Sequence, residues 1–333
     1  MDDSLSRTLC IHIPFLLPPT LEIEITMPIQ SAAILGAGLL YLGTSHRLMT
    51  EMILSQIGRK PLSDRCMDRE VYALCAGFAL GLVNINYAEK AIGLSDLQLD
   101  ERLIRLVEGG KVMDPPLSML SANMNAESSK CSSVLEGDNV NIHITAPGAI
   151  MALSIIHMQT DNITISRRLE IPATFYALEH AKPFHILLKI LAKNLIMWSG
   201  IEGTKEWLYS QIPTLIREIF ESPIKVVQSK YGGTMIAEEE IDYSAIALCY
   251  ISILSGSILA MGFKYAGTNN KAVMSIICSE IEKLRAIPTT SLKDQNYINH
   301  TNVTKNKVDK YSLNNCLCIC ACAISIVFYE VIR

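Results

Sequence analysis

The sequence predicts an all-α protein, an α-solenoid built from repeated pairs of helices. Two observations support this fold class. Half of the 333 residues are hydrophobic and only 19% are charged, so most helices must be buried on more than one side. A motif also recurs, an apolar helix with two small residues that are separated by one residue. The pairs are Gly36 and Gly38, Ala79 and Gly81, Ala152 and Ser154, Ala260 and Gly262, and Ala323 and Ser325.

Residues 1–27 are expected to form an extended N-terminal lead-in to the array. Pro18 and Pro19 exclude a regular helix at that point. The segment 21–25 then alternates leucine or isoleucine with glutamate, which is typical of a short edge strand.

The first repeat begins near residue 28 and contains Gly36 and Gly38 within one predicted helix. A glycine inside a helix costs roughly 1 kcal/mol relative to alanine, so two of them need a compensating gain. Close approach of a neighbouring helix supplies that gain, since no Cβ stands in the way. Gly43 suits the left-handed position that ends the helix, and Thr44 or Ser45 is expected to cap the next one.

Four further repeats are predicted to start near residues 68, 146, 243 and 312, and together they form one solenoid over residues 28–333. Gly267 follows the fourth apolar helix, as Gly43 follows the first. The expected partner and intervening helices cover residues 96–108, 167–198 with breaks at two prolines, 207–220 and 269–285.

Three segments between the repeats have a different composition. Residues 109–133 are rich in serine, asparagine and proline and are predicted to be a mobile insertion. Residues 136–145 contain Val140, Ile142 and Ile144 in alternation with polar residues, which predicts a small β insertion. Residues 289–310 are read as a polar linker.

Composition argues against several classes of protein. The longest apolar runs, 245–261 and 316–328, are interrupted or shorter than the about 20 residues that a membrane span needs. No signal peptide is predicted at the first residues. A net charge of −4 without a long basic run disfavours nucleic-acid binding. We therefore expect neither a membrane nor a nucleic acid as partner.

No motif predicts catalysis, a cofactor or a metal. The four cysteines of 316–322 lack the paired C-x₂-C spacing of zinc sites and are better explained as buried small side chains. The glycines of 36–38 do not follow a strand or precede a Walker lysine. His157 is interpreted as a packed histidine, and Trp198 and Trp207 as core residues. A helical enzyme or metal protein that uses cysteine and histidine remains the more distant alternative.

Longer stretches of the chain resemble a known family, the anaphase-promoting complex subunit 1 family with its proteasome/cyclosome (PC) repeats. The resemblance rests on the run Ile34 to Arg47 and spans almost the whole chain in the right order. Other matching stretches are Ile11 to Pro14, Leu17 to Glu22, Asp68 to Glu70, Glu136 to Asp138, Ala146 to Ala149, Arg167 and Arg168, Tyr176, Leu178, Trp198 and Gly262 to Gly267.

The resemblance implies a ring of inner and outer helices and a scaffold role without catalytic residues or a cofactor. The family's parent complex is a multisubunit E3 ubiquitin ligase that controls mitotic progression. Its partners would be other subunits of that complex, including the Doc-domain and cullin-like subunits, in the nucleus and cytoplasm. The alternative within the same repeat class is a proteasome regulatory-particle scaffold. The sequences of the insertions favour the anaphase-promoting complex subunit over the proteasome scaffold.

The chain departs from the family pattern after Val327. The family's turn after the apolar helix is replaced by Phe328 to Arg333. We therefore expect an open, partial ring and a fragment or truncated form of a longer protein.

Overall fold

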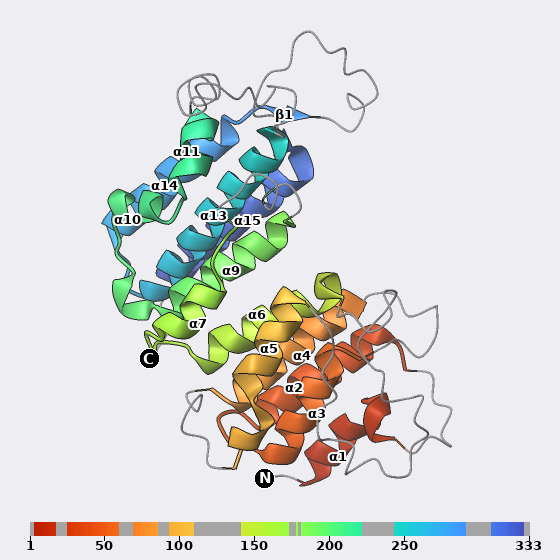
Figure 1. Ribbon diagram of the computed structural model, residues 1–333. Helices are drawn as coiled ribbons and strands as arrows, with labels where there is room; N and C mark the ends of the chain where they lie inside the picture. The colour runs from red at the N-terminus through yellow and green to blue at the C-terminus, as the bar shows by residue number, and fades with distance from the viewer. Residues whose placement is uncertain are drawn as a thin grey trace. The chain divides into compact units, whose positions relative to one another are not determined.

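The computed structural model describes residues 3–17, 25–59, 69–85, 93–109, 141–172, 178, 181–221, 243–290 and 308–329. Almost all regular structure in these residues is helical, which confirms the predicted all-α class. The chain divides into two compact units, Met1–Arg168 and Leu169–Arg333. The single solenoid over residues 28–333 stays a prediction. Figure 1 colours the first unit red to yellow-green and the second green to blue.

The first unit stacks its helices in two layers. The helices α2, α4 and α6 pack side by side in one layer, and α3 and α5 pack against α4 and α6 in the other (Figure 1). The elements of this unit are α1 (Asp3–Ile11), η1 (Pro14–Leu16), α2 (Met27–Leu40), α3 (Arg47–Ile57), α4 (Arg69–Val83), η2 (Ser95–Leu97), α5 (Leu99–Glu108), α6 (Ile142–Ile156) and α7 (Ile163–Arg168).

The second unit repeats this arrangement around one long central helix. Helix α13 packs between α9 and α15, while α10 and α11 lie against α13 and α14 lies against α15. The elements are α9 (Pro183–Ile196), η4 (Trp198–Gly200), α10 (Lys205–Ser210), α11 (Thr214–Glu221), α13 (Tyr243–Lys264), α14 (Lys271–Arg285), β1 (Thr289–Thr290), β2 (Val308–Asp309) and α15 (Lys310–Val327). We refer to α2, α4, α6, α9, α13 and α15 as the inner helices.

Polar side chains fix where several helices begin. Asn270 accepts backbone N–H bonds at the start of α14, and Asp309 does the same for α15. The cap of α3 is His46, whose Nδ1 accepts from the N–H of Met49, rather than Thr44 or Ser45 as the sequence predicted. Ser45 has a φ of +48°, outside the extended region of a usual cap, so the cap moves one residue along the chain.

The predicted β insertion at 136–145 is wrong where the structure describes it. Residues Ile142 to Thr145 form the first turn of α6. Asn141 caps this turn by accepting from the N–H of His143, and Thr145 donates to the carbonyl of Leu106. Packing of α6 against α4 and α5 therefore overrides the β propensity of the alternating isoleucines.

Two further predictions need correction. The lead-in 1–27 is not extended throughout, because residues Asp3–Ile11 form α1, which packs on α2. The helix predicted over 207–220 is divided into α10 and α11. Pro213 lies between them, and a proline disfavours helical geometry at the residue before it.

Several predictions fall outside the described residues. These are residues 21–24 of the edge strand predicted at 21–25, residues 110–133 of the mobile insertion and most of the linker 289–310. The described ends of that linker, β1 and β2, pair in parallel, with Thr289 opposite Val308.

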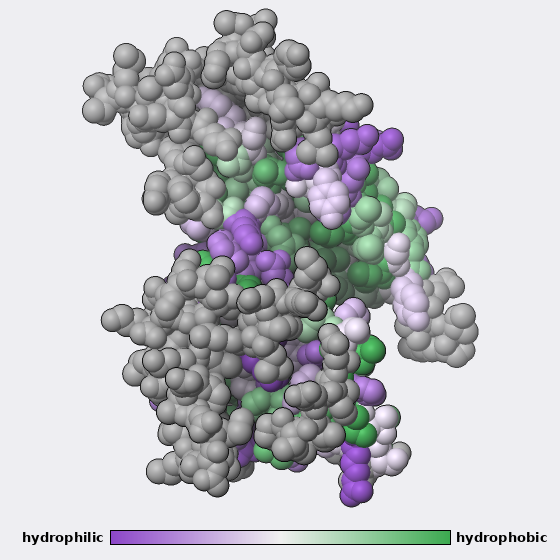
Figure 2. All heavy atoms as spheres, turned by 90° about the vertical axis from the view of Figure 1, so that its right-hand side faces the viewer, coloured by the Kyte–Doolittle hydropathy of each residue, from purple (hydrophilic) through white to green (hydrophobic). Residues whose placement is uncertain are grey.

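Two described helices, α13 and α15, are long and apolar enough to cross a membrane by length and composition alone. Of the apolar stretch in α13, 83% is buried, as is usual for the central helix of a protein core. The corresponding stretch of α15 is only 28% buried. Figure 2 views the side on which α15 lies, and hydrophobic side chains gather there.

Candidate functional site: the stacked inner helices

The inner helices of the first unit meet at the predicted small residues. A Cβ added to Gly38 in α2 would lie 2.5 Å from the Cα of Ala79 in α4. This distance is too short for any side chain, so the two backbones approach as closely as glycine permits. The second small residue of one inner helix thus contacts the first small residue of the next.

The same relation holds in the second unit. A Cβ on Gly262 in α13 would lie 2.9 Å from the Cα of Ala323 in α15. The relation does not extend to Gly81, whose closest neighbour is the side chain of Ile155 in α6 rather than Ala152. Of the remaining predicted positions, Ala152, Ser154 and Ala260 are fully buried.

Gly36 has a different neighbour from the other small residues. The side chain of Leu9 in α1 lies 3.2 Å from the position of a Cβ on Gly36. Ser6 of α1 also hydrogen bonds to Tyr41, with 2.9 Å between the two hydroxyl oxygens. Helix α1 therefore packs against the side of α2 that carries Gly36.

The closest approach in the first unit lies at glycines that the sequence did not single out as repeat positions. A Cβ on Gly77 in α4 would lie 2.0 Å from the carbonyl oxygen of Gly148 in α6. A Cβ on Gly148 would in turn lie 2.2 Å from the carbonyl oxygen of Ala73. Two glycines on neighbouring inner helices are the signal that could have identified this contact.

Turns join successive repeats by backbone hydrogen bonds. In the first unit the N–H groups of Gly43 and Ser45 donate to the carbonyls of Leu82 and Val83, each at 2.9 Å. These carbonyls end α4, where a helix leaves its last C=O groups without intrahelical partners. The turn after one inner helix thus caps the C-terminal end of the next.

The second unit contains the same cap. Gly267 donates to Ile326 at 3.0 Å and Asn269 donates to Val327 at 3.1 Å, and both carbonyls end α15. Gly267 has a φ of +66° and Gly43 a φ of +65°, so both occupy the left-handed region that favours glycine. The Gly-Thr signature therefore marks a contact between repeats as well as the end of a helix.

Threonine stabilises each of these turns internally. The Oγ1 atoms of Thr44 and Thr268 donate to the carbonyls of Tyr41 and Tyr265 at 2.7 Å. Thr160 makes the same bond to His157 after α6. The turn has one geometry in three places although the sequence around it varies.

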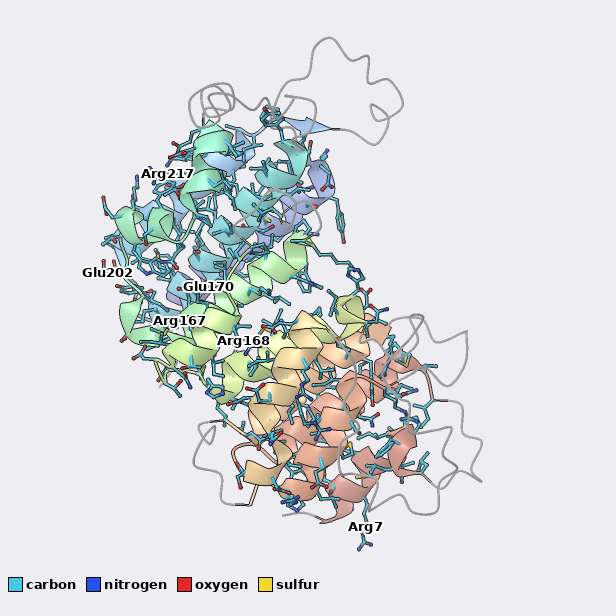
Figure 3. The ribbon with its side chains drawn as sticks, viewed as in Figure 1. Arg7, Arg167, Arg168, Glu170, Glu202 and Arg217 are labelled. Atoms are coloured by element: carbon cyan, nitrogen blue, oxygen red, sulfur yellow. The ribbon has the colours of Figure 1, made fainter. Side chains whose placement is uncertain are left out.

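Charged side chains tie neighbouring elements together within the first unit. Arg47 at the start of α3 binds the carboxylate of Asp96 in η2 and donates to the carbonyl of Gly93 at 2.6 Å. Arg168 of α7, labelled in Figure 3, donates to both carboxylate oxygens of Glu108 at 2.9 and 2.7 Å. All four charged side chains are substantially exposed, so these pairs contribute little stability.

The second unit holds a buried carboxylate, Glu280 of α14, which is 1% exposed. Tyr209 of α10 donates to it at 2.9 Å, and Lys283 donates to it at 2.7 Å. Burial raises the pKa of the Tyr209 hydroxyl above its ordinary value. Tyr209 also borders an open cleft of about 530 Å³. The cleft is lined by Lys205, Glu206, Tyr209, Ser210, Arg217 and Glu221, of which Figure 3 labels Arg217.

The residues that suggested chemistry have structural partners. His157 is fully buried and its Nε2 lies 2.9 Å from Asp100. Cys316 and Cys320 are buried against the rest of the second unit, while Cys318 and Cys322 are exposed. Burial raises the pKa of Cys320 to about 12, so this thiol stays protonated near neutral pH and is a poor nucleophile. Trp207 is buried and Trp198 half-buried, its ring under the Lys264 ammonium.

Among the residues that the structure describes, no group of three or more histidine, cysteine, aspartate or glutamate side chains could hold a metal ion. The features that recur in both units are instead the small-residue contacts and the turn caps. These features position the helices relative to one another within each unit.

Comparison with known proteins identifies the family of this chain. The APC1 fifth domain family matches residues 3–329. Anaphase-promoting complex subunit 1 of Mus musculus and that of Homo sapiens are each 36% identical to the chain over 282 residues, which cover 83% of the chain. The Dictyostelium discoideum subunit 1 is 30% identical and covers 98% of the chain.

A protein named negative regulator of mitosis from Emericella nidulans is 28% identical over 85% of the chain. The chain spans 14% of the length of the mouse and human proteins and 17% of the Dictyostelium protein. Because the family match covers nearly the whole chain, the chain belongs to the anaphase-promoting complex subunit 1 family and corresponds to its fifth domain.

Proposed function

We propose that the chain is a segment of a non-catalytic scaffold subunit of the anaphase-promoting complex. This complex is a multisubunit E3 ubiquitin ligase that controls mitotic progression, and other subunits would carry its catalysis. The segment would act in the nucleus and cytoplasm as part of a PC-repeat solenoid. Its role would be to hold helix surfaces in fixed register for neighbouring subunits, including the Doc-domain and cullin-like subunits.

The turn cap is the single observation that carries this proposal. Gly43 and Ser45 join one repeat to the next through backbone groups, and Gly267 and Asn269 do the same in the second unit. Backbone bonds of this kind fix the spacing of successive helices whatever side chains they carry. The outer surfaces are then free to differ along the stack, which is how solenoid scaffolds present extended binding surfaces.

Affinity purification of the tagged chain from mitotic cells tests the proposal. We expect co-purification of other anaphase-promoting complex subunits with the wild-type chain and with Gly36→Ala, which keeps the stack. Gly77→Val should abolish co-purification because it separates α4 from α6 at their closest contact. Recovery of proteasome subunits instead, or of neither assembly by a folded chain, would contradict the proposal.

A further inference from the structure

We draw no further inference here: the strongest candidate, the open cleft that α10 and α11 line beside Tyr209, carries nothing, because Lys205 and Arg217 are balanced there by Glu206 and Glu221 and nothing in the structure shows what would occupy it.

Discussion

In the first unit the row α2–α4–α6 has α1 against its first helix, whereas in the second unit the row α9–α13–α15 has α14 packed on α15, whose exposed residues include Asn315, Cys318 and Cys322. Both rows use a small-residue contact and a turn cap between repeats. The ends of the rows, the outer helices and the buried polar groups all differ. The comparison indicates that the two shared contacts define the repeat and that the remaining sequence varies between the units.

The units also differ in how closely their inner helices approach. Gly77 and Gly148 bring two backbones together in the first unit. In the second unit Gly256 lies against the carbonyl of Leu187, where a Cβ would be 2.8 Å from the oxygen. Ser255 and Ser257 flank this glycine and donate to carbonyls of their own helix. The first unit should therefore be the less tolerant of added volume.

The largest expected effect is that of Gly77→Ala in the first unit. The new methyl group would lie 2.0 Å from a backbone oxygen that cannot move without displacing α6. We expect the free energy of unfolding to fall by about 3 kcal/mol or more. Gly36→Ala meets only the flexible end of Leu9 and gains helix propensity, so its effect should be within about 1 kcal/mol. Urea denaturation followed by circular dichroism compares the two.

Equal effects of Gly77→Ala and Gly36→Ala would contradict the assignment of the closest contact. Gly256→Ala gives the corresponding value for the second unit. We expect it to lie between the other two, because the carbonyl it meets is farther away.

Raising the pH above 10 should lower the stability of the protein through one buried tyrosine of the first unit. Tyr72 is almost fully buried and donates to Gln56, and burial raises its pKa to about 12. The unfolded chain releases this proton near pH 10, so the contribution of Tyr72 is complete below that pH and is lost as the pH rises to 12. Relative to Tyr72→Phe, wild type should lose about 2 kcal/mol of stability over this interval. Parallel pH dependence of the two proteins would contradict the expectation.

The turn glycines should give smaller effects than Gly77→Ala, and the effects should be alike in the two units. Gly43→Ala and Gly267→Ala each place a Cβ at a positive φ, which costs about 1–2 kcal/mol. Asparagine tolerates this region better, so Gly43→Asn and Gly267→Asn should cost less. Thermal unfolding of the four variants measures the differences. A cost at one glycine and none at the other would show that the turns are not equivalent.

The sequence predicted the helical class and the small positions because glycine and alanine at helical spacing have a direct packing consequence. The sequence could not show that the two glycines have different neighbours. Gly36 contacts α1, whereas Gly38 contacts α4. That difference depends on which helix lies on each side, which is long-range information. The contact between Gly77 and Gly148 was missed for the same reason.

Predictions from local sequence patterns were wrong where tertiary packing outweighed the local propensity. Ile142 and Ile144 alternate as in a strand, yet Asn141 caps a helix there and α6 packs between two neighbours. The sequence indicated the donor side of each turn cap but not the acceptor side. Gly43 and Thr44 mark the end of a helix, but the α4 carbonyls that accept from Gly43 and Ser45 lie about forty residues away and carry no signature, because any residue has a backbone carbonyl.

Amide hydrogen exchange of the turns tests most directly whether the repeats are joined by their backbones. Gly43, Ser45, Gly267 and Asn269 lie in turns, where amides usually exchange rapidly. If these N–H groups cap the following inner helices, they should exchange as slowly as the amides within α4 and α15, and Gly77→Ala should accelerate the exchange of Gly43 and Ser45 alone. Exchange of all four amides at the rate of an unstructured peptide would contradict the account.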